Sequence, residues 1–147
     1  MEPLVAMGVS VVALMGLYSS ASQAGLIVRT GREIASGGEM VQERLESFRY
    51  TTTWANVTTA AGIQSVASSA SAIAANFGNV TETFTVQPYP SGSALTVTRS
   101  PGGSFSSSGA DLSSNKCVKF TVNATWTGAG NVQRSRQLST IITKGGL

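Results

Sequence analysis

The chain begins with a long stretch of apolar residues. No charged residue occurs between Glu2 and Arg29, and positions 3–18 are almost wholly hydrophobic. As an α-helix, this uncharged stretch of about 26 residues would span about 39 Å, which exceeds the roughly 30 Å hydrocarbon core of a bilayer. Segment 1–28 is therefore predicted to form a helix that lies in a membrane or in the core of a filament.

Two other interpretations of this segment stay open at this point. The small residues at 20–24 resemble the cleavage site of a secretory signal peptide, although the acidic Glu2 precedes the apolar run where a signal peptide carries a basic residue. A plain single-pass membrane anchor has the same length and composition. The pattern that follows the apolar run discriminates between these interpretations.

Beyond the apolar run the pattern becomes amphipathic with helical spacing. Apolar residues recur every three to four positions, and charged residues occupy the other faces. The residues predicted to pack this helix on the rest of the protein are Ile27, Ile34, Val41, Leu45 and Phe48. Gly31 and Gly38 lie on the same stripe, where they either admit a close neighbour or weaken the helix. One helix is thus expected from about residue 3 to residue 49, with a length of about 70 Å.

From Thr83 onward the hydrophobic period falls to two. Segments 83–87 and 94–99 are predicted as strands with a turn rich in Pro and Ser between them, and 118–126 alternates most regularly. Segment 132–143 is predicted to return as the antiparallel partner of 118–126. The glycine- and serine-rich stretch 101–109 is expected to be a flexible loop. These elements predict an antiparallel sheet of about four strands.

Between helix and sheet, residues 50–81 are rich in Thr, Ala, Ser and Asn, and a short second helix is expected among them. The predicted fold class is therefore α+β. The predicted organisation is an apolar helix half, 1–28, followed by a globular head, 29–147, in which 29–49 form the amphipathic helix half, 50–81 the connection and 82–147 the sheet.

Composition argues against catalysis. Charged residues make up 12% of the chain and histidine is absent, which removes the commonest general base and the commonest transition-metal ligand. Cys117 is the single cysteine, so neither an internal disulfide nor a thiolate metal site is available. We expect Cys117 to behave as a small hydrophobic residue, with a reactive or intermolecular thiol as the alternative. Asp111 has no evident acid or base partner, so we predict no enzymatic activity, no metal and no cofactor.

The net charge of +3 comes from few charges and indicates little about partners. Four basic residues near the end of the chain could form a patch on the last predicted hairpin: Lys116, Lys119, Arg134 and Arg136. An ordinary solvated face is favoured over a surface that binds DNA or another anion.

Three Asn-x-Thr triplets match the acceptor pattern for N-glycosylation, at Asn56, Asn79 and Asn123. Chance matches are expected in a chain so rich in Thr and Asn, so these residues are only candidate acceptors.

The chain resembles type IV pilins and the related pseudopilins of type II secretion, over residues 2–49 and more weakly over 117–147. Glu2 followed by the apolar run resembles the start of a processed pilin, and Gly31–Glu33 and Val41–Glu46 resemble the amphipathic half of a pilin helix. The resemblance implies a type IV pilin fold, in which a long N-terminal helix packs by its C-terminal half on a small antiparallel sheet. Two features differ from the family pattern: only Met1 precedes Glu2, and one cysteine cannot close the C-terminal disulfide of many members.

The resemblance also implies a function, that of a structural subunit polymerising through its N-terminal helix into a helical surface filament. The task of the filament stays open among motility, adhesion, DNA uptake, secretion and conduction. The precursor would lie in the inner membrane, be cleaved by prepilin peptidase and N-methylated, and be taken up by the pilus assembly machinery. Residues expected at the subunit contacts are Glu2, Pro3, Leu4, Val5, Met7, Gly8, Val12, Leu14, Gly16 and Leu17. Glu2 would contact the N-terminal amine of a neighbouring subunit, or alternatively interact with its own helix dipole. The alternatives are a minor pilin or pseudopilin, and a membrane-anchored module for adhesion or DNA binding.

Overall fold

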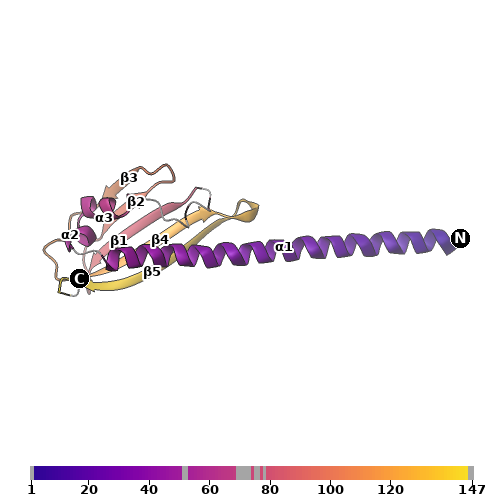
Figure 1. Cartoon of the computed structure of the whole chain (residues 1–147), viewed down its shortest axis with the longest axis horizontal. Helices are drawn as coiled ribbons and strands as arrows, with labels where there is room; N and C mark the ends of the chain where they lie inside the picture. Colours follow the sequence, from indigo (N-terminus) through magenta and orange to yellow (C-terminus); the bar gives the residue numbers. More distant parts are fainter. Residues whose placement is uncertain (1, 51–52, 69–73, 75–76, 78, 146–147) are drawn as a thin grey trace.

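A single helix dominates the molecule. The computed structural model of the chain describes residues 2–50, 53–68, 74, 77 and 79–145, with the side chains of residues 2–6 and 9 outside the description. Helix α1 (Glu2–Arg49) runs without interruption for 48 residues, about 72 Å at 1.5 Å per residue. Its C-terminal half lies beside the sheet, and its N-terminal half projects from the head as a free rod (Figure 1).

The head consists of short helices and one antiparallel sheet. The remaining elements are α2 (Ala55–Thr58), α3 (Ala60–Val66), β1 (Thr81–Pro88), β2 (Leu95–Arg99), β3 (Phe105–Ser108), β4 (Cys117–Thr127), the 3-10 turn η2 (Ala129–Asn131) and β5 (Gln133–Thr143). The strand order is β3-β2-β1-β4-β5. The α+β prediction is confirmed, and the helix on its antiparallel sheet is compatible with a pilin-like fold.

The sheet contains five strands where about four were expected. The additional strand, β3, lies inside the stretch predicted as a flexible loop and pairs with β2 from Arg99↔Phe105 to Thr96↔Ser108. A tight turn starts this pairing, because Gly103 N donates to Ser100 O and Ser100 N donates to Ser104 O, both at 2.9 Å. Three of the four residues of β3 are serines, so the strand is formed by ladder hydrogen bonds and has no hydrophobic alternation that the sequence could reveal.

The predicted short second helix is present as α3. The hydroxyl of Thr59 accepts a hydrogen bond from Gly62 N at 3.0 Å, which satisfies one free N–H group at the start of the helix. Ile63 of α3 and Ala67, which directly follows the helix, are fully buried. Residues 69–73, which follow α3 in the predicted connection, lie outside the described residues.

The core lies between the C-terminal half of α1 and one face of the sheet. Met40, Val41 and Phe48 of α1 are fully buried against inward-facing residues of the strands. The ring of Phe48 lies 4.6 Å from that of Phe120 and 5.3 Å from that of Phe84, between centroids. Strand β4 alternates buried and exposed positions along its length, as its sequence predicts.

The predicted packing stripe meets the sheet over most of its length but not at its start. Val41 and Phe48 are fully buried, while Leu45 and Ile34 are half-buried. Ile27 is 72% exposed, so its predicted contact with the sheet is wrong. The physical reason is that the contacts between the head and α1 are made at Thr30 and Glu33, which lie C-terminal to Ile27.

Glu82 is a fully buried carboxylate that is held by two arginines from different elements. Arg44 of α1 donates to Glu82 through Nε at 2.6 Å and through Nη2 at 3.0 Å, and Arg99 of β2 donates through Nη1 at 3.5 Å. The amphipathic pattern predicted that the charged residues of α1 lie on its outer faces, which is wrong for Arg44. It lies three residues after Val41 and four before Phe48, on the buried stripe, where the carboxylate compensates its charge.

Two adjacent glycines of α1 have different surroundings. A Cβ at Gly37 would overlap the indole ring of Trp126, which is 1% exposed, whereas a Cβ at Gly38 would have no heavy atom within 4 Å. Gly37 therefore allows the close approach of helix and sheet.

This difference predicts opposite effects of the same substitution. We expect Gly37→Ala to lower the free energy of unfolding by about 1–3 kcal/mol, because Trp126 must move. Gly38→Ala is expected to raise it by about 0.5–1 kcal/mol, because alanine restricts the unfolded chain and meets nothing. Urea denaturation followed by tryptophan fluorescence measures both, and equal effects of the two variants would contradict the packing described.

Candidate assembly surface

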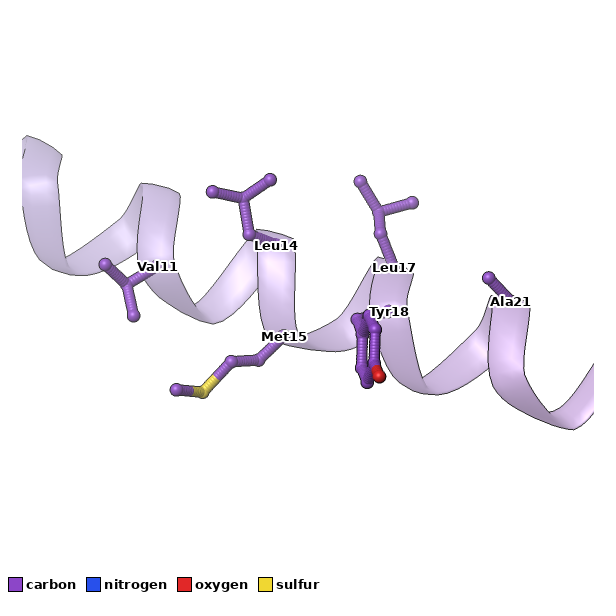
Figure 2. Close-up of a pocket in the computed structure, with 6 residues that line it drawn as sticks. All are labelled: Val11, Leu14, Met15, Leu17, Tyr18 and Ala21. Carbon is purple, nitrogen blue, oxygen red and sulfur yellow. The ribbon is translucent and has the colours of Figure 1, made fainter.

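The N-terminal half of α1 exposes apolar side chains in all directions. Figure 2 shows Leu14 and Leu17 on one side of the helix and Met15 and Tyr18 on the other. Leu14 is 66% exposed and Tyr18 81%. A helix that is hydrophobic all round is normally covered by lipid or by other protein on every side. No described residue of the subunit covers this surface.

The predicted assembly residues follow this exposed half. Met7, Val12, Leu14 and Leu17 are exposed, and Gly8 and Gly16 have no heavy atom near the position of a Cβ. Helix α1 begins at Glu2, so Pro3 lies in its first turn, where proline is tolerated. The side chains of Glu2, Pro3, Leu4 and Val5 lie outside the described residues, and their role stays a prediction.

The exposed half also meets the requirements of a membrane segment. From Ser10 onward α1 is long and apolar enough to cross a bilayer, and none of its most apolar window is buried in the subunit. This criterion concerns length and composition alone.

A groove with a volume of about 450 Å³ lies on the head between α1 and β5. The small helix residues Gly31, Ala35 and Gly38 line it on one side, and Leu138 lines it on the edge strand together with the polar Arg136 and Gln137. Gly31 and Gly38 have open space at the Cβ position. Because these side chains are small, another helix can approach the backbone of α1 closely.

Glu33 fixes the head to α1 where the helix enters the head. Both carboxylate oxygens of Glu33 accept hydrogen bonds from Ala129 N, at 3.0 and 3.2 Å. Arg134 lies 3.4 Å from Glu33 and donates to the hydroxyl of Thr30 at 3.2 Å, while the exposed Arg29 pairs with Glu33 at 3.3 Å. Together these contacts hold the β4–β5 turn against the helix.

The remaining candidate residues do not form a second site. Asp111 accepts a hydrogen bond from Ala60 N at 3.0 Å, which places it at the start of α3. Cys117 is half-buried at the start of β4. Among the described residues no group of three or more His, Cys, Asp or Glu side chains could hold a metal ion.

The predicted basic patch is divided between the two faces of the sheet. Arg134 and Arg136 pair with Trp126 and Ala124, on the face toward α1, and Arg134 is engaged by Glu33. Lys119 pairs with Ile141 on the opposite face. These three residues therefore do not form one patch, because the pleat sends alternate residues to opposite sides.

The three candidate glycosylation sites differ in setting. Asn79 is exposed just before β1 with a positive φ of 56°, whereas Asn123 is half-buried in the middle of β4 and Asn56 is half-buried in α2. Their modification stays a prediction.

Comparison with known proteins does not assign the chain to a family. No protein-family model, no curated protein and no solved structure matches it. The resemblance to pilins therefore rests on the apolar helix, its amphipathic continuation and the sheet on which that continuation packs.

Proposed function

We propose that the chain is a pilin-like subunit that polymerises into a helical surface filament through α1. The observation that carries this proposal is the apolar, solvent-exposed N-terminal half of α1, continuous with a folded head. Burial of one leucine, valine or methionine side chain contributes about 1.5–3 kcal/mol. The many such side chains of this half supply a large driving force for association once the subunits leave the membrane.

The shape of the exposed surface favours an open polymer over a closed dimer. A rod that is apolar all round is covered only by neighbours on several sides, which a single partner does not provide. Contacts between different surfaces of identical subunits that do not close on themselves generate a helical filament. The groove formed by Gly31, Ala35, Gly38 and Leu138 offers a neighbour's helix a second, different surface.

Glu2 requires a partner in such a filament. An unpaired carboxylate in a dry helix bundle is costly. In the proposed assembly Glu2 pairs with the N-terminal amine of an adjacent subunit. Before assembly the precursor lies in the inner membrane, where prepilin peptidase and the assembly machinery act on it. A minor pilin and a membrane-anchored binding module are the other candidates.

Electron cryo-microscopy of fibres sheared from cells tests the proposal. We expect fibres with a central bundle of α1 helices and the heads outside. A chain that stays in the membrane fraction as a monomer, absent from every fibre, would overturn the major-subunit proposal and favour the anchored module.

A substitution in the groove separates assembly from folding. We expect Gly38→Leu to leave the subunit folded, because its Cβ position is open, but to reduce fibre yield by about tenfold or more, because it fills the groove needed by a neighbour. Gly102→Leu is the matched control, because Gly102 lies in a loop of the head and also has no heavy atom within 4 Å of its Cβ position. Equal fibre yields from both variants would exclude the groove from the contact.

A further inference from the structure

The face of the sheet that points away from α1 is almost uncharged. Its outward positions carry Thr81, Thr83, Thr85, Gln87, Thr96, Thr98, Ser106, Ser108, Cys117, Lys119, Thr121, Asn123, Thr125, Thr127, Gln133, Ser135, Gln137, Ser139, Ile141 and Thr143. None of them is buried, so the face is open to solvent. All five strands are described, and Lys119 is the one charged residue at these positions.

The hydroxyl groups of this face lie in rows across the strands. Thr85 lies between Thr96 of β2 and Thr121 of β4, and the Thr121 hydroxyl lies 3.0 Å from that of Ser139 in a hydrogen bond. Neighbouring strands are about 4.8 Å apart, so the rows repeat at that spacing. Each hydroxyl and amide both donates and accepts, which suits a partner that carries the same groups.

One hollow interrupts this polar surface. It has a volume of about 340 Å³ and is lined by Tyr89, Lys119, Ser139, Thr140 and Ile141. Tyr89 is 53% exposed and Ile141 52%, and Lys119 and Ile141 are direct cross-strand neighbours. A hydrogen bond of 3.1 Å from Tyr89 N to Cys117 O holds the tyrosine beside β4. The volume is at the lower end of the range for small-molecule sites, about 300–1,000 Å³.

The hollow combines an aromatic ring, an aliphatic side chain, an ammonium group and hydroxyls. A sugar ring has the complementary chemistry, with apolar C–H faces and a rim of hydroxyl groups. We propose that the hollow binds one ring of an acidic polysaccharide, whose carboxylate pairs with Lys119, and that the adjoining sugars lie along the hydroxyl rows.

Other classes of partner fit this face less well. A single cation cannot neutralise the successive phosphates of a nucleic acid. A stable protein interface has an apolar centre, and this face is polar except at the hollow. The proposal goes beyond polymerisation and applies equally to a free subunit and to a filament.

Calorimetric titration of the full chain in detergent tests the proposal. The probe is an oligosaccharide with one terminal galacturonate and otherwise neutral sugars, and the same oligosaccharide with a neutral terminal galactose serves for comparison. We expect the acidic probe to bind, and Tyr89→Ala and Lys119→Ser each to weaken binding by about tenfold or more, as loss of a central contact does. Tyr50→Ala and Lys144→Ser, which remove the same groups from exposed positions elsewhere, should change the Kd by less than about twofold.

Three outcomes would overturn the proposal: absence of binding to either probe, equal losses in all four variants, or equal affinity for the neutral and acidic probes. If Lys119→Ser weakens binding of the acidic probe but leaves the affinity for the neutral probe unchanged, the assigned ion pair is supported. None of these results depends on fibre formation, so the sugar site and the filament are tested separately.

Discussion

Glu82→Ala is expected to destabilise the head by about 3–5 kcal/mol, because removing one partner leaves buried charge without its compensation. Arg44 and Arg99 both donate to this carboxylate, which is fully buried between α1, β1 and β2. The variant would retain both buried guanidinium groups without the carboxylate to which they donate. Urea denaturation of the full chain in detergent, followed by tryptophan fluorescence, measures the loss.

A matched substitution on the same helix controls for the loss of a glutamate. Glu39→Ala removes an exposed carboxylate and is expected to change the free energy of unfolding by less than about 0.5 kcal/mol. Replacing Arg44, Glu82 and Arg99 together with apolar residues should recover much of the stability lost in Glu82→Ala. Similar losses for Glu82→Ala and Glu39→Ala would show that the buried cluster does not stabilise the fold.

Leu14→Asp is expected to abolish fibres while leaving the head folded. Leu14 lies in the middle of the exposed apolar half and makes no contribution to the core of the head. A carboxylate in a dry helix bundle costs several kcal/mol, and in a filament the cost recurs in every subunit. Fibre yield after shearing, measured by electron microscopy, gives the result.

Leu14→Ala is the matched control, because it shortens the side chain without adding charge, and fibres should persist. One aspartate costs about 2.5–3.5 kcal/mol at the centre of a membrane helix, which a long apolar segment tolerates. The Asp variant should therefore still be found in the membrane fraction. Normal fibres from Leu14→Asp would contradict the proposed packing of α1 in the filament core.

Periodicity was sufficient to predict the parts of the fold that have one buried face. Helix α1 and strand β4 have long, regular patterns, and both were predicted within a few residues of their observed ends. Strand β3 has no such pattern, since three of its four residues are serines and only Phe105 packs against the core. Ile27 has the right spacing for the stripe, but spacing does not show where the sheet ends.

Contacts between distant segments could not be predicted from local pattern. Arg44 and Glu82 are 38 residues apart, and Glu33 and Ala129 are 96 residues apart. A signal for the first pair was present, because Arg44 interrupts the apolar stripe between Val41 and Phe48. The groove beside Gly38 and the hollow beside Tyr89 arise where separate strands and helices meet, so they become visible only in three dimensions.

The Glu33 contacts have a mechanical consequence. They join the β4–β5 turn to α1 where the rod leaves the head, and β4 and β5 run lengthwise beside the C-terminal half of that rod (Figure 1). Ladder hydrogen bonds are perpendicular to the strands. A pull on this turn along α1 would draw β4 and β5 together along the rest of the sheet and would load the ladder between β4 and β1 in shear. The hydrogen bonds of that ladder would then share the force. The head is thus arranged to carry tension along the same axis on which a filament would be stretched.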